Sequence, residues 1–260
     1  MVENAHNHSP KTADRGTVDP ADVERFSRIA DEWWDPAGKF GPLHRLNPIR
    51  IGYIRDRAAA HWQRDPLSGR PLEGLSLLDI GCGGGLLSEP MTRLGAKVTA
   101  VDASARNIAV AAHHAERQEL AIDYRQGTAE ALAEGGAAFD IVMALEIVEH
   151  VADADLFLRS CARMVKPGGL LFLSTLNRTA KAWAMAIAGA EYVLRWLPRG
   201  THDWKKFLKP SEIVRGLRDG GVDAQEIVGV VYSPLSRAWS LNKNDLDVNY
   251  MLYGSRRPAG

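Results

Sequence analysis

Two carboxylates and an imidazole lie within five residues in the stretch LEIVEHV, residues 145–151. Glu146, Glu149 and His150 are of the residue types that bind divalent cations in proteins, and an imidazole also serves as a general base near neutral pH. The order E-x-x-E-H differs from the H-E-x-x-H pattern of zinc proteases. Four interpretations stay open: a divalent-metal site, a metal-free His150 base, a Glu146 that only contacts a cofactor, and a solvated helix start.

The elements around this stretch alternate between short apolar runs and helical periodicity. Runs that are apolar throughout suit strands buried on both faces, and their alternation with helices implies a parallel sheet. We expect an α/β fold with a mostly parallel seven-stranded sheet, helices on both faces and an antiparallel edge strand. The predicted strands cover residues 75–80, 96–102, 121–127, 139–146, 170–177, 224–233 and 248–256.

A glycine-rich turn, DIGCGGG at residues 79–85, follows the first predicted strand and precedes a helix. Gly81 and Gly83 let the backbone approach a ligand closely. Asp102 ends the next strand, where an acid accepts hydrogen bonds from ribose hydroxyls. A dinucleotide site would need Gly or Ala where Leu86 stands, which disfavours a hydride donor.

This turn, Asp79-x-Gly81-x-Gly83-x-Gly85, resembles the first motif of class I methyltransferases that use S-adenosylmethionine. A narrower resemblance, to the O-methyltransferases of ubiquinone biosynthesis, spans nearly the whole chain beyond its N-terminal tail. It is carried by FSRIADEWWDPAGKFGPLHRLNPIRIGYI, ALEIVEHV, STLNRTAKAW, GAEYVLRWLPRGTHDWKKFLKP and DVNYML. The resemblance implies a Rossmann-like fold and cofactor binding by Arg50, Gly81, Gly83, Asp102 and Leu145.

The same resemblance implies methylation of phenolic hydroxyls on polyprenylated catechol-type rings, at both O-methylation steps of the pathway. It favours Glu146, Glu149 and His150 as catalytic residues that hold Mg²⁺ or another divalent cation. Such a cation lowers the pKa of a catechol hydroxyl and orients both oxygens. Two alternatives are an O-methyltransferase of a soluble small phenol and a non-catalytic S-adenosylmethionine-binding scaffold. A formal net charge of zero disfavours nucleic acid as a partner.

Within the N-terminal part, residues 20–35 are predicted as one helix that Asp19 or Asp22 can cap. Pro42 and Pro48 are expected to lie in a loop before a second helix that runs to about Gln63.

The chain divides into three predicted parts: a disordered tail at residues 1–19, a helical cap at 20–70 and a methyltransferase domain at 71–260. Trp33 and Trp34 are expected to pack the cap as a lid, and Cys82 to be a small packing residue. His202 and Asp203 are weak candidates for the substrate pocket, because a structural loop explains them equally well.

A long tryptophan-rich insertion at residues 177–209 ends in basic residues. Tryptophan and tyrosine have apolar rings with one polar group, and together with nearby lysines they suit an anionic membrane surface. A lid over the substrate explains these side chains too. Two distant cysteines and the lack of an apolar leader favour a cytoplasmic enzyme at the periphery of the inner membrane, with other enzymes of the pathway as further partners. The residues concerned are Trp183, Met185, Ile187, Tyr192, Val193, Leu194, Trp196 and Leu197, with Lys181, Arg195, Arg199, Lys205, Lys206 and Lys209.

Overall fold

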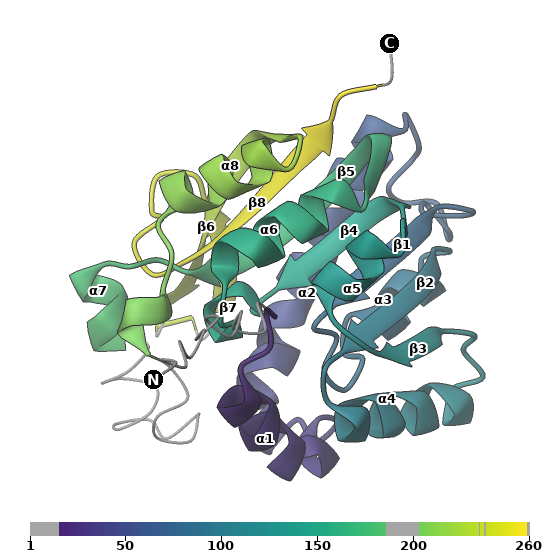
Figure 1. The fold of residues 1–260 in the computed structure, drawn as a ribbon, viewed down its shortest axis with the longest axis horizontal. Helices are drawn as coiled ribbons and strands as arrows, with labels where there is room; N and C mark the ends of the chain where they lie inside the picture. Colours follow the sequence, from purple (N-terminus) through teal and green to yellow (C-terminus); the bar gives the residue numbers. More distant parts are fainter. Residues whose placement is uncertain (1–15, 186–202, 234, 237, 259–260) are drawn as a thin grey trace, which may run out of the picture.

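The computed structural model describes residues 16–185, 203–233, 235–236 and 238–258. A single sheet forms its centre (Figure 1). Its strands are β1 (Ser76–Ile80), β2 (Lys97–Asp102), β3 (Asp123–Gln126), β4 (Phe139–Leu145), β5 (Val165–Leu176), β6 (Val222–Ser233), β7 (Ala238–Asn242) and β8 (Asn249–Arg256).

The strands lie in the order β3-β2-β1-β4-β5-β8-β6-β7. The first five strands of the chain pair in parallel, whereas β8 pairs antiparallel with both β5 and β6. The predicted mostly parallel α/β sheet with an antiparallel edge is therefore confirmed.

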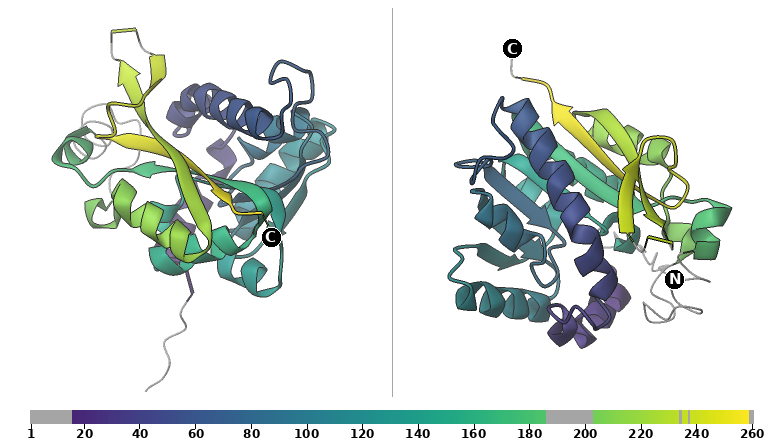
Figure 2. Two further views of the ribbon diagram at one scale, coloured as in Figure 1. Left: turned by 90° about the horizontal axis from the view of Figure 1, so that it is seen from above. Right: turned by 180° about the vertical axis from the view of Figure 1, so that it is seen from behind.

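Helices cover both faces of the sheet (Figures 1 and 2). Alternate strand residues enter different cores: Leu77 and Phe172 belong to one, and Leu78 and Leu171 to the other. This is why the predicted strands read as apolar throughout. The first core includes residues of α2 (Gly41–His61), α3 (Ser88–Arg93) and α4 (Ala105–Arg117), and the second residues of α5 (Ala129–Glu134), α6 (Ala154–Arg163) and α8 (Pro210–Asp219).

The N-terminal cap consists of α1 (Pro20–Arg28), the short 3₁₀ helix η1 (Ala30–Glu32) and the first turns of α2. Asp19 caps α1, as one of the two predicted cap residues, by accepting hydrogen bonds from the backbone N–H groups of Ala21 and Asp22. Together α1 and η1 lie beneath the carboxyl ends of the parallel strands (Figure 1). The cap is thus placed to cover whatever binds there.

Three expectations differ from the structure. An eighth strand, β7, pairs with β6 at the sheet edge, where only seven strands were predicted. The segment around Pro42 and Pro48, predicted as a loop, belongs to α2. Pro42 lies in the first turn, where its missing N–H costs nothing, while Pro48 removes one hydrogen bond inside a long helix. The predicted single helix over residues 20–35 ends at Arg28 and continues as η1.

Three short helices complete the described chain: η2 (Val148–His150), α7 (Ala180–Ala182) and η4 (Trp204–Lys206). None of the helices in the described part of the chain is both long and apolar enough to span a membrane.

Candidate active site

A cavity of about 750 Å³ opens at the carboxyl ends of β1 and β4. The strand order reverses direction here, because β1 has β2 on one side and β4 on the other. Open α/β sheets bind ligands at such a switch point. Four of the five predicted cofactor residues, Gly81, Gly83, Asp102 and Leu145, line this cavity.

Asp102 holds the glycine turn in place. Its carboxylate accepts hydrogen bonds from the backbone N–H of Gly83 at 3.0 Å and of Ser104 at 2.8 Å, and from the side-chain amide of Asn107 at 3.1 Å. Burial raises the pKa of Asp102, and these three donors oppose that rise. The predicted ribose acceptor therefore also supports the turn on which a cofactor would rest.

The cap closes over the glycine turn through Trp33. Its indole N–H donates to Asn107 Oδ1 at 3.1 Å, and its ring stacks on Phe40 with centroids 3.7 Å apart. A Cβ atom added at Gly83 or Gly84 would collide with the Trp33 ring, so only glycine permits this approach. The predicted packing of Trp33 in the cap is confirmed by these contacts, and the role of the cap as a lid stays a prediction.

Trp34 packs beside Trp33 in the N-terminal cap. Its indole N–H donates to the carbonyl of Gly84 at 2.9 Å, and its ring stacks on His114. Its predicted packing role is confirmed as well. Sequence reasoning missed Asn107, although an amide in the first turn of the helix that follows Asp102 is a detectable signal.

Two more groups lie under the turn. Burial raises the pKa of Asp79 to about 6, although the Ser88 hydroxyl donates to its carboxylate at 2.6 Å. The Asp79 side chain lines the cavity and is charged above that pH, which favours a cationic ligand. Cys82 is buried, and burial raises the pKa of its thiol, as befits the predicted packing role.

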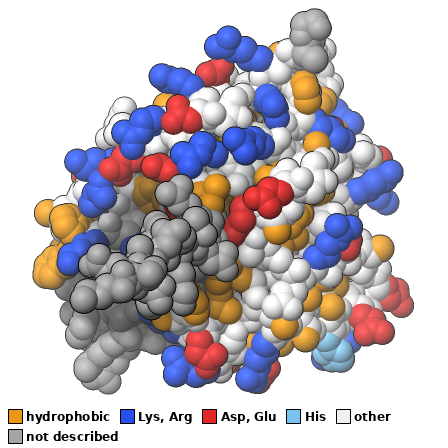
Figure 3. Space-filling model, viewed as in Figure 1, with side chains coloured by type: hydrophobic (Ala, Val, Ile, Leu, Met, Phe, Trp, Pro, Cys, Tyr) orange, Lys and Arg blue, Asp and Glu red, His pale blue; other side chains and the backbone are white. Residues whose placement is uncertain are grey.

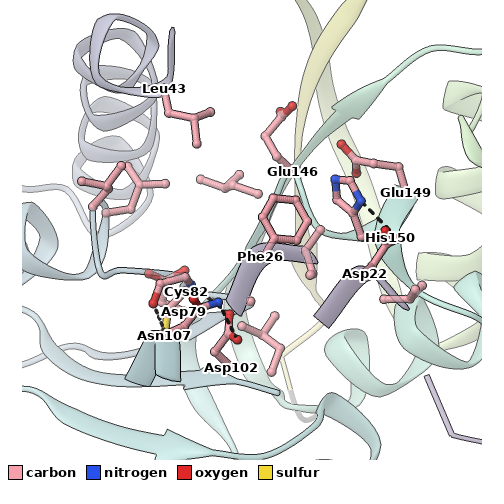
Figure 4. A pocket seen from close by; sticks show the side chains of 18 of the residues that line it. Asp22, Phe26, Leu43, Asp79, Cys82, Asp102, Asn107, Glu146, Glu149 and His150 are labelled. Carbon is pink, nitrogen blue, oxygen red and sulfur yellow. Dashed lines mark hydrogen bonds and ion pairs between the residues drawn. The ribbon is translucent and has the colours of Figure 1, made fainter. Parts of the chain in front are cut away.

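His150 lies at the other end of the cavity, on η2 (Figure 4). Its Nδ1 atom is 3.5 Å from a carboxylate oxygen of Asp22 in the cap helix α1. The Phe26 ring meets the imidazole edge-on, with centroids 5.1 Å apart. Asp22 was considered in the sequence only as a helix cap, and no local pattern indicates a partner so far along the chain.

The Glu146 side chain faces Arg50, in the middle of α2. Glu146 has a φ of +52°, a left-handed conformation that non-glycine residues rarely adopt. Its carboxylate forms an ion pair with Arg50 at 2.8 Å and accepts hydrogen bonds from Ser174 at 2.6 Å and from Asn249. The carboxylate is thus already engaged by three neighbours.

Arg50 is buried behind the cavity wall, which Asn47 and Glu146 form at this point. Its Nη2 atom is close to Glu146 but poorly aligned for a hydrogen bond, and its Nε has no hydrogen-bond partner. Donors therefore remain for a second carboxylate. Direct contact between Arg50 and a cofactor stays a prediction, because Arg50 does not itself line the cavity.

Glu149 is buried and accepts one hydrogen bond, from the Thr175 hydroxyl at 2.8 Å. Burial and the nearby Glu146 charge raise its pKa to about 8. A raised pKa disfavours the charged carboxylate, which fits an oxygen, Oε1, that has no hydrogen-bond partner among the described residues.

The predicted metal site is not supported by this arrangement. Among the described residues, no group of three or more His, Cys, Asp or Glu side chains is placed to hold a metal ion. Glu146 faces Arg50, Glu149 accepts a hydrogen bond from Thr175, and His150 faces Asp22. The donor set of Glu146, Glu149 and His150 thus does not fit a divalent cation in this geometry.

Apolar side chains line much of the cavity. They come from the cap, from α2, from the end of β5, from the segment after α7, from the β6–β7 hairpin and from the residue before β8: Phe26, Leu43, Leu46, Leu176, Met185, Tyr232, Trp239 and Val248. Asp203 lies elsewhere, exposed, with its side chain capping η4, which supports the structural-loop interpretation. His202 is outside the described residues.

Residues 78–173 match the family model for a methyltransferase domain. The chain is 57% identical over 247 residues to a ubiquinone biosynthesis O-methyltransferase of Chelativorans sp. (strain BNC1), covering 95% of this chain and 97% of the relative. It is also 57% identical to the protein of that name from Parvibaculum lavamentivorans, covering 94% and 96%.

Solved structures share the fold. Magnesium protoporphyrin IX methyltransferase from Synechocystis PCC 6803, with bound SAH, matches with a TM-score of 0.60 and 21% identity over 91% of this chain and 95% of that one. A possible histamine N-methyltransferase from Thermotoga maritima matches with a TM-score of 0.59 and 18% identity over 91% and 100%. The predicted Rossmann-like methyltransferase fold is confirmed.

Replacing Asp102 with Asn should weaken binding of S-adenosylmethionine by about 1–3 kcal/mol, the usual cost of removing a buried polar partner. The change removes the charge that orders the Gly83 and Ser104 amides and that accepts from ribose. Titration calorimetry measures the affinity, and Asp123→Asn, an exposed acid on the neighbouring strand, is the matched control. Unchanged affinity in Asp102→Asn would falsify the assignment.

Proposed function

The chain belongs to the family of ubiquinone biosynthesis O-methyltransferases, and on this premise we propose that it methylates phenolic hydroxyls of polyprenylated catechol-type rings. The enzyme is a methyltransferase that uses S-adenosylmethionine. Both O-methylation steps of the pathway are assigned to this one site. The single observation that carries the proposal is a cavity that joins the glycine turn to His150.

The two ends of the cavity suit two different ligands. At one end, Asp79 and Asp102 place negative charge beside the glycine turn. Gly81 and Gly83 have no side chains, so a ligand can come close to the backbone there. At the other end, the Phe26 ring lies against His150, and the many apolar side chains that line the cavity accommodate an aromatic ring and the start of an isoprenoid tail. A phenol bound there would lie between the methyl donor and an imidazole.

His150 is the proposed general base. Bound S-adenosylmethionine supplies an electrophilic methyl group on a positively charged sulfur. The His150 imidazole accepts the proton of the phenolic hydroxyl, so that the oxygen becomes nucleophilic enough to attack the methyl carbon. The new O–CH₃ bond forms as the C–S bond breaks, and the sulfur keeps the electron pair. Binding both reactants in one cavity also lowers the entropic cost of bringing them together in the correct orientation.

Glu146 and Glu149 take structural roles in this proposal. Glu146 neutralises the buried Arg50 guanidinium, and the buried Glu149 ties η2 to β5 by accepting a hydrogen bond from the Thr175 hydroxyl. No step is routed through a metal ion, because the described side chains do not assemble the predicted ligand set.

Membrane contact is the proposed route to the substrate. Trp183 and Met185 are 51% and 43% exposed, and Trp204 is 38% exposed. Figure 3 shows hydrophobic, lysine and arginine side chains gathered at the left edge of this face. Lys205 and Lys209 are exposed, whereas Lys181 and Lys206 are already paired with acids. Ile187, Tyr192, Val193, Leu194, Arg195, Trp196, Leu197 and Arg199 lie outside the described residues.

This contact would make the enzyme a peripheral protein of the inner membrane on its cytoplasmic side. The long apolar tail of the proposed substrate partitions into lipid, so an enzyme that works on its ring benefits from reaching the bilayer surface. Other enzymes of ubiquinone biosynthesis are proposed as further partners, since intermediates of this kind stay in the membrane between steps.

Purified protein should transfer a labelled methyl group from S-adenosylmethionine to a short-chain polyprenyl catechol. His150→Gln should lower kcat by about 10²–10⁴-fold, the usual share of a general base, and leave cofactor affinity unchanged. The exposed His113 on α4 gives the matched control, His113→Gln. Equal turnover of a tail-free catechol would favour the soluble-phenol alternative, and cofactor binding without turnover would favour the scaffold.

The same assay decides the role of a cation. Activity that survives chelation assigns deprotonation to His150 alone. Activity that is lost on chelation and returns with Mg²⁺ would mean that Glu146 and Glu149 leave their present partners to bind the ion.

On vesicles rich in anionic lipid, the native protein should float with the lipid, and Trp183→Glu should shift it toward the soluble fraction. Burial of an aromatic ring at the interface is lost in that variant, and a negative charge replaces it. Leu67→Glu, at an exposed leucine between α2 and β1, is the control for a new charge elsewhere. Native protein that never floats would contradict membrane contact.

A further inference from the structure

The cavity continues beyond the stretch that follows β4, along the carboxyl edge of the parallel strands. Leu176 lines it at the end of β5, and Asn249 lines it at the start of β8. Tyr232 and Trp239 line it next, near the end of β6 and the start of β7. These strands lie in the order β4-β5-β8-β6-β7, so the lining follows the sheet strand by strand. The cavity therefore has an arm, lined by these four residues, that leads away from the glycine turn.

The length of this arm suits a chain-like ligand. Four steps from strand to strand separate β4 from β7, and neighbouring strands lie about 4.8 Å apart, so the arm extends roughly 19 Å along the sheet. A single aromatic ring spans only a small part of this distance. A ring that carries a hydrocarbon tail would occupy more of the arm than a ring alone.

Two aromatic side chains form the far end of the arm. Tyr232 pairs with Trp239 in the register of β6 and β7, and their ring centroids are 5.1 Å apart at an interplanar angle of 52°. Tyr232 lies on the same face of β6 as Val230, which is the face that α2 covers. From α2, the Leu43 side chain points into the cavity (Figure 4). The arm thus lies between the start of α2 and an aromatic pair.

Apolar side chains continue from this pair to the surface. Met185 lines the cavity and is exposed as well. At the turn of the β6–β7 hairpin, Leu235 is 98% exposed, and Leu241, on the same face of β7 as Trp239, is also exposed. This hairpin projects from the body of the protein (Figure 2). An apolar rim of this kind suits a hydrocarbon ligand better than a polar one.

The hairpin is held firmly at its base. A Cβ atom added at Gly229 of β6 would collide with the backbone carbonyl of Asp245, so the loop after β7 packs directly on this strand. On the side of α2, the Glu226 carboxylate of β6 accepts hydrogen bonds from Tyr53 at 3.1 Å and from Arg57 at 2.7 Å. The aromatic pair is therefore carried by a supported hairpin.

We propose that the β6–β7 hairpin is the tail-binding end of the cavity, where Tyr232 and Trp239 select phenols that carry an isoprenoid tail. This inference rests on the proposed O-methylation, and it adds a specificity site and a direction to it. The ring stays beside the methyl donor, and the first units of the tail pack along the arm. The rest of a long tail leaves the protein over the apolar rim. Burial of the tail against the aromatic pair supplies affinity that a tail-free catechol lacks.

A purely structural role is the competing explanation for Trp239, because its ring also packs against the core on the α2 face. The chain offers a matched control in Trp62, at the C-terminal end of α2. Trp62 is another partly buried tryptophan that packs against the same core, and it lies outside the lining of the cavity. Trp62→Ala therefore removes comparable packing and leaves the proposed tail site untouched.

The experiment measures kcat/KM for two catechols, one with a farnesyl tail and one without a tail. Native protein should prefer the farnesyl catechol. Trp239→Ala should lower this preference by about 10–100-fold, as expected for one buried aromatic contact, chiefly through a higher KM for the farnesyl catechol. Its kcat/KM for the tail-free catechol should stay within about twofold of the native value. Trp62→Ala should keep the native preference, and Trp239→Phe, which keeps an aromatic ring, should keep most of it.

A preference that is unchanged in Trp239→Ala, or that falls equally in Trp62→Ala, would overturn the proposal in favour of a packing role. Native protein that turns over both catechols with equal kcat/KM would overturn it too, and would leave the O-methylation itself standing. Absence of turnover of either catechol by native protein would instead reject the proposed function.

A second measurement needs neither turnover nor a variant. A farnesyl catechol with a photoreactive diazirine at the end of its tail is irradiated with the native protein, and mass spectrometry locates the label. The proposal expects the label within the hairpin, at residues 230–243. A label found only elsewhere, such as in the cap at residues 17–40, would show that the tail leaves by another side and would overturn the proposal.

Discussion

The buried hydrogen-bond chain that runs from Trp33 through Asn107 and Asp102 to the Gly83 amide is the constraint on which the site depends. Each link satisfies a polar group that would otherwise be buried without a partner. The chain fixes the glycine turn, the acid that is proposed to face the cofactor, and the cap that packs on both. A cofactor pocket and its cover are therefore one unit, although they come from separate parts of the sequence.

At the acidic stretch after β4, the backbone conformation of Glu146 decides which partners its carboxylate meets. Because Glu146 adopts a left-handed conformation, its carboxylate faces Arg50, Ser174 and Asn249. Arg50 needs an anion in its buried position, and burial together with the charge of Glu146 raises the pKa of Glu149. His150 is then the group of this stretch that remains for acid–base work.

Much of the fold could be predicted because buried parallel strands are apolar throughout and their turns contain glycine. The strands ending at Ile80 and Asp102 and the helices after them follow from that pattern. Strand β7 escaped prediction because it is short, largely exposed and at the sheet edge, where burial leaves no periodicity. The loop predicted around Pro48 is a helix, because the packing of α2 outweighs the one hydrogen bond that this proline removes.

The site was predictable where its residues follow a strand, as Gly81, Gly83 and Asp102 do. The contact of Asp22 with His150 and the seat of Trp33 on Gly84 depend on tertiary packing, which spacing does not encode. The predicted metal set had the right residue types, and only the backbone conformation at Glu146 showed that these side chains do not converge.

Amide hydrogen exchange over residues 17–40, with and without bound S-adenosylhomocysteine, tests most directly whether the cap and the cofactor site close as one unit. In the native protein, ligand should slow exchange throughout this segment. In Gly84→Ala, whose added methyl group meets the Trp33 ring, the cap should stay exchangeable although ligand is bound. Equal exchange in native protein with and without bound ligand would contradict the account.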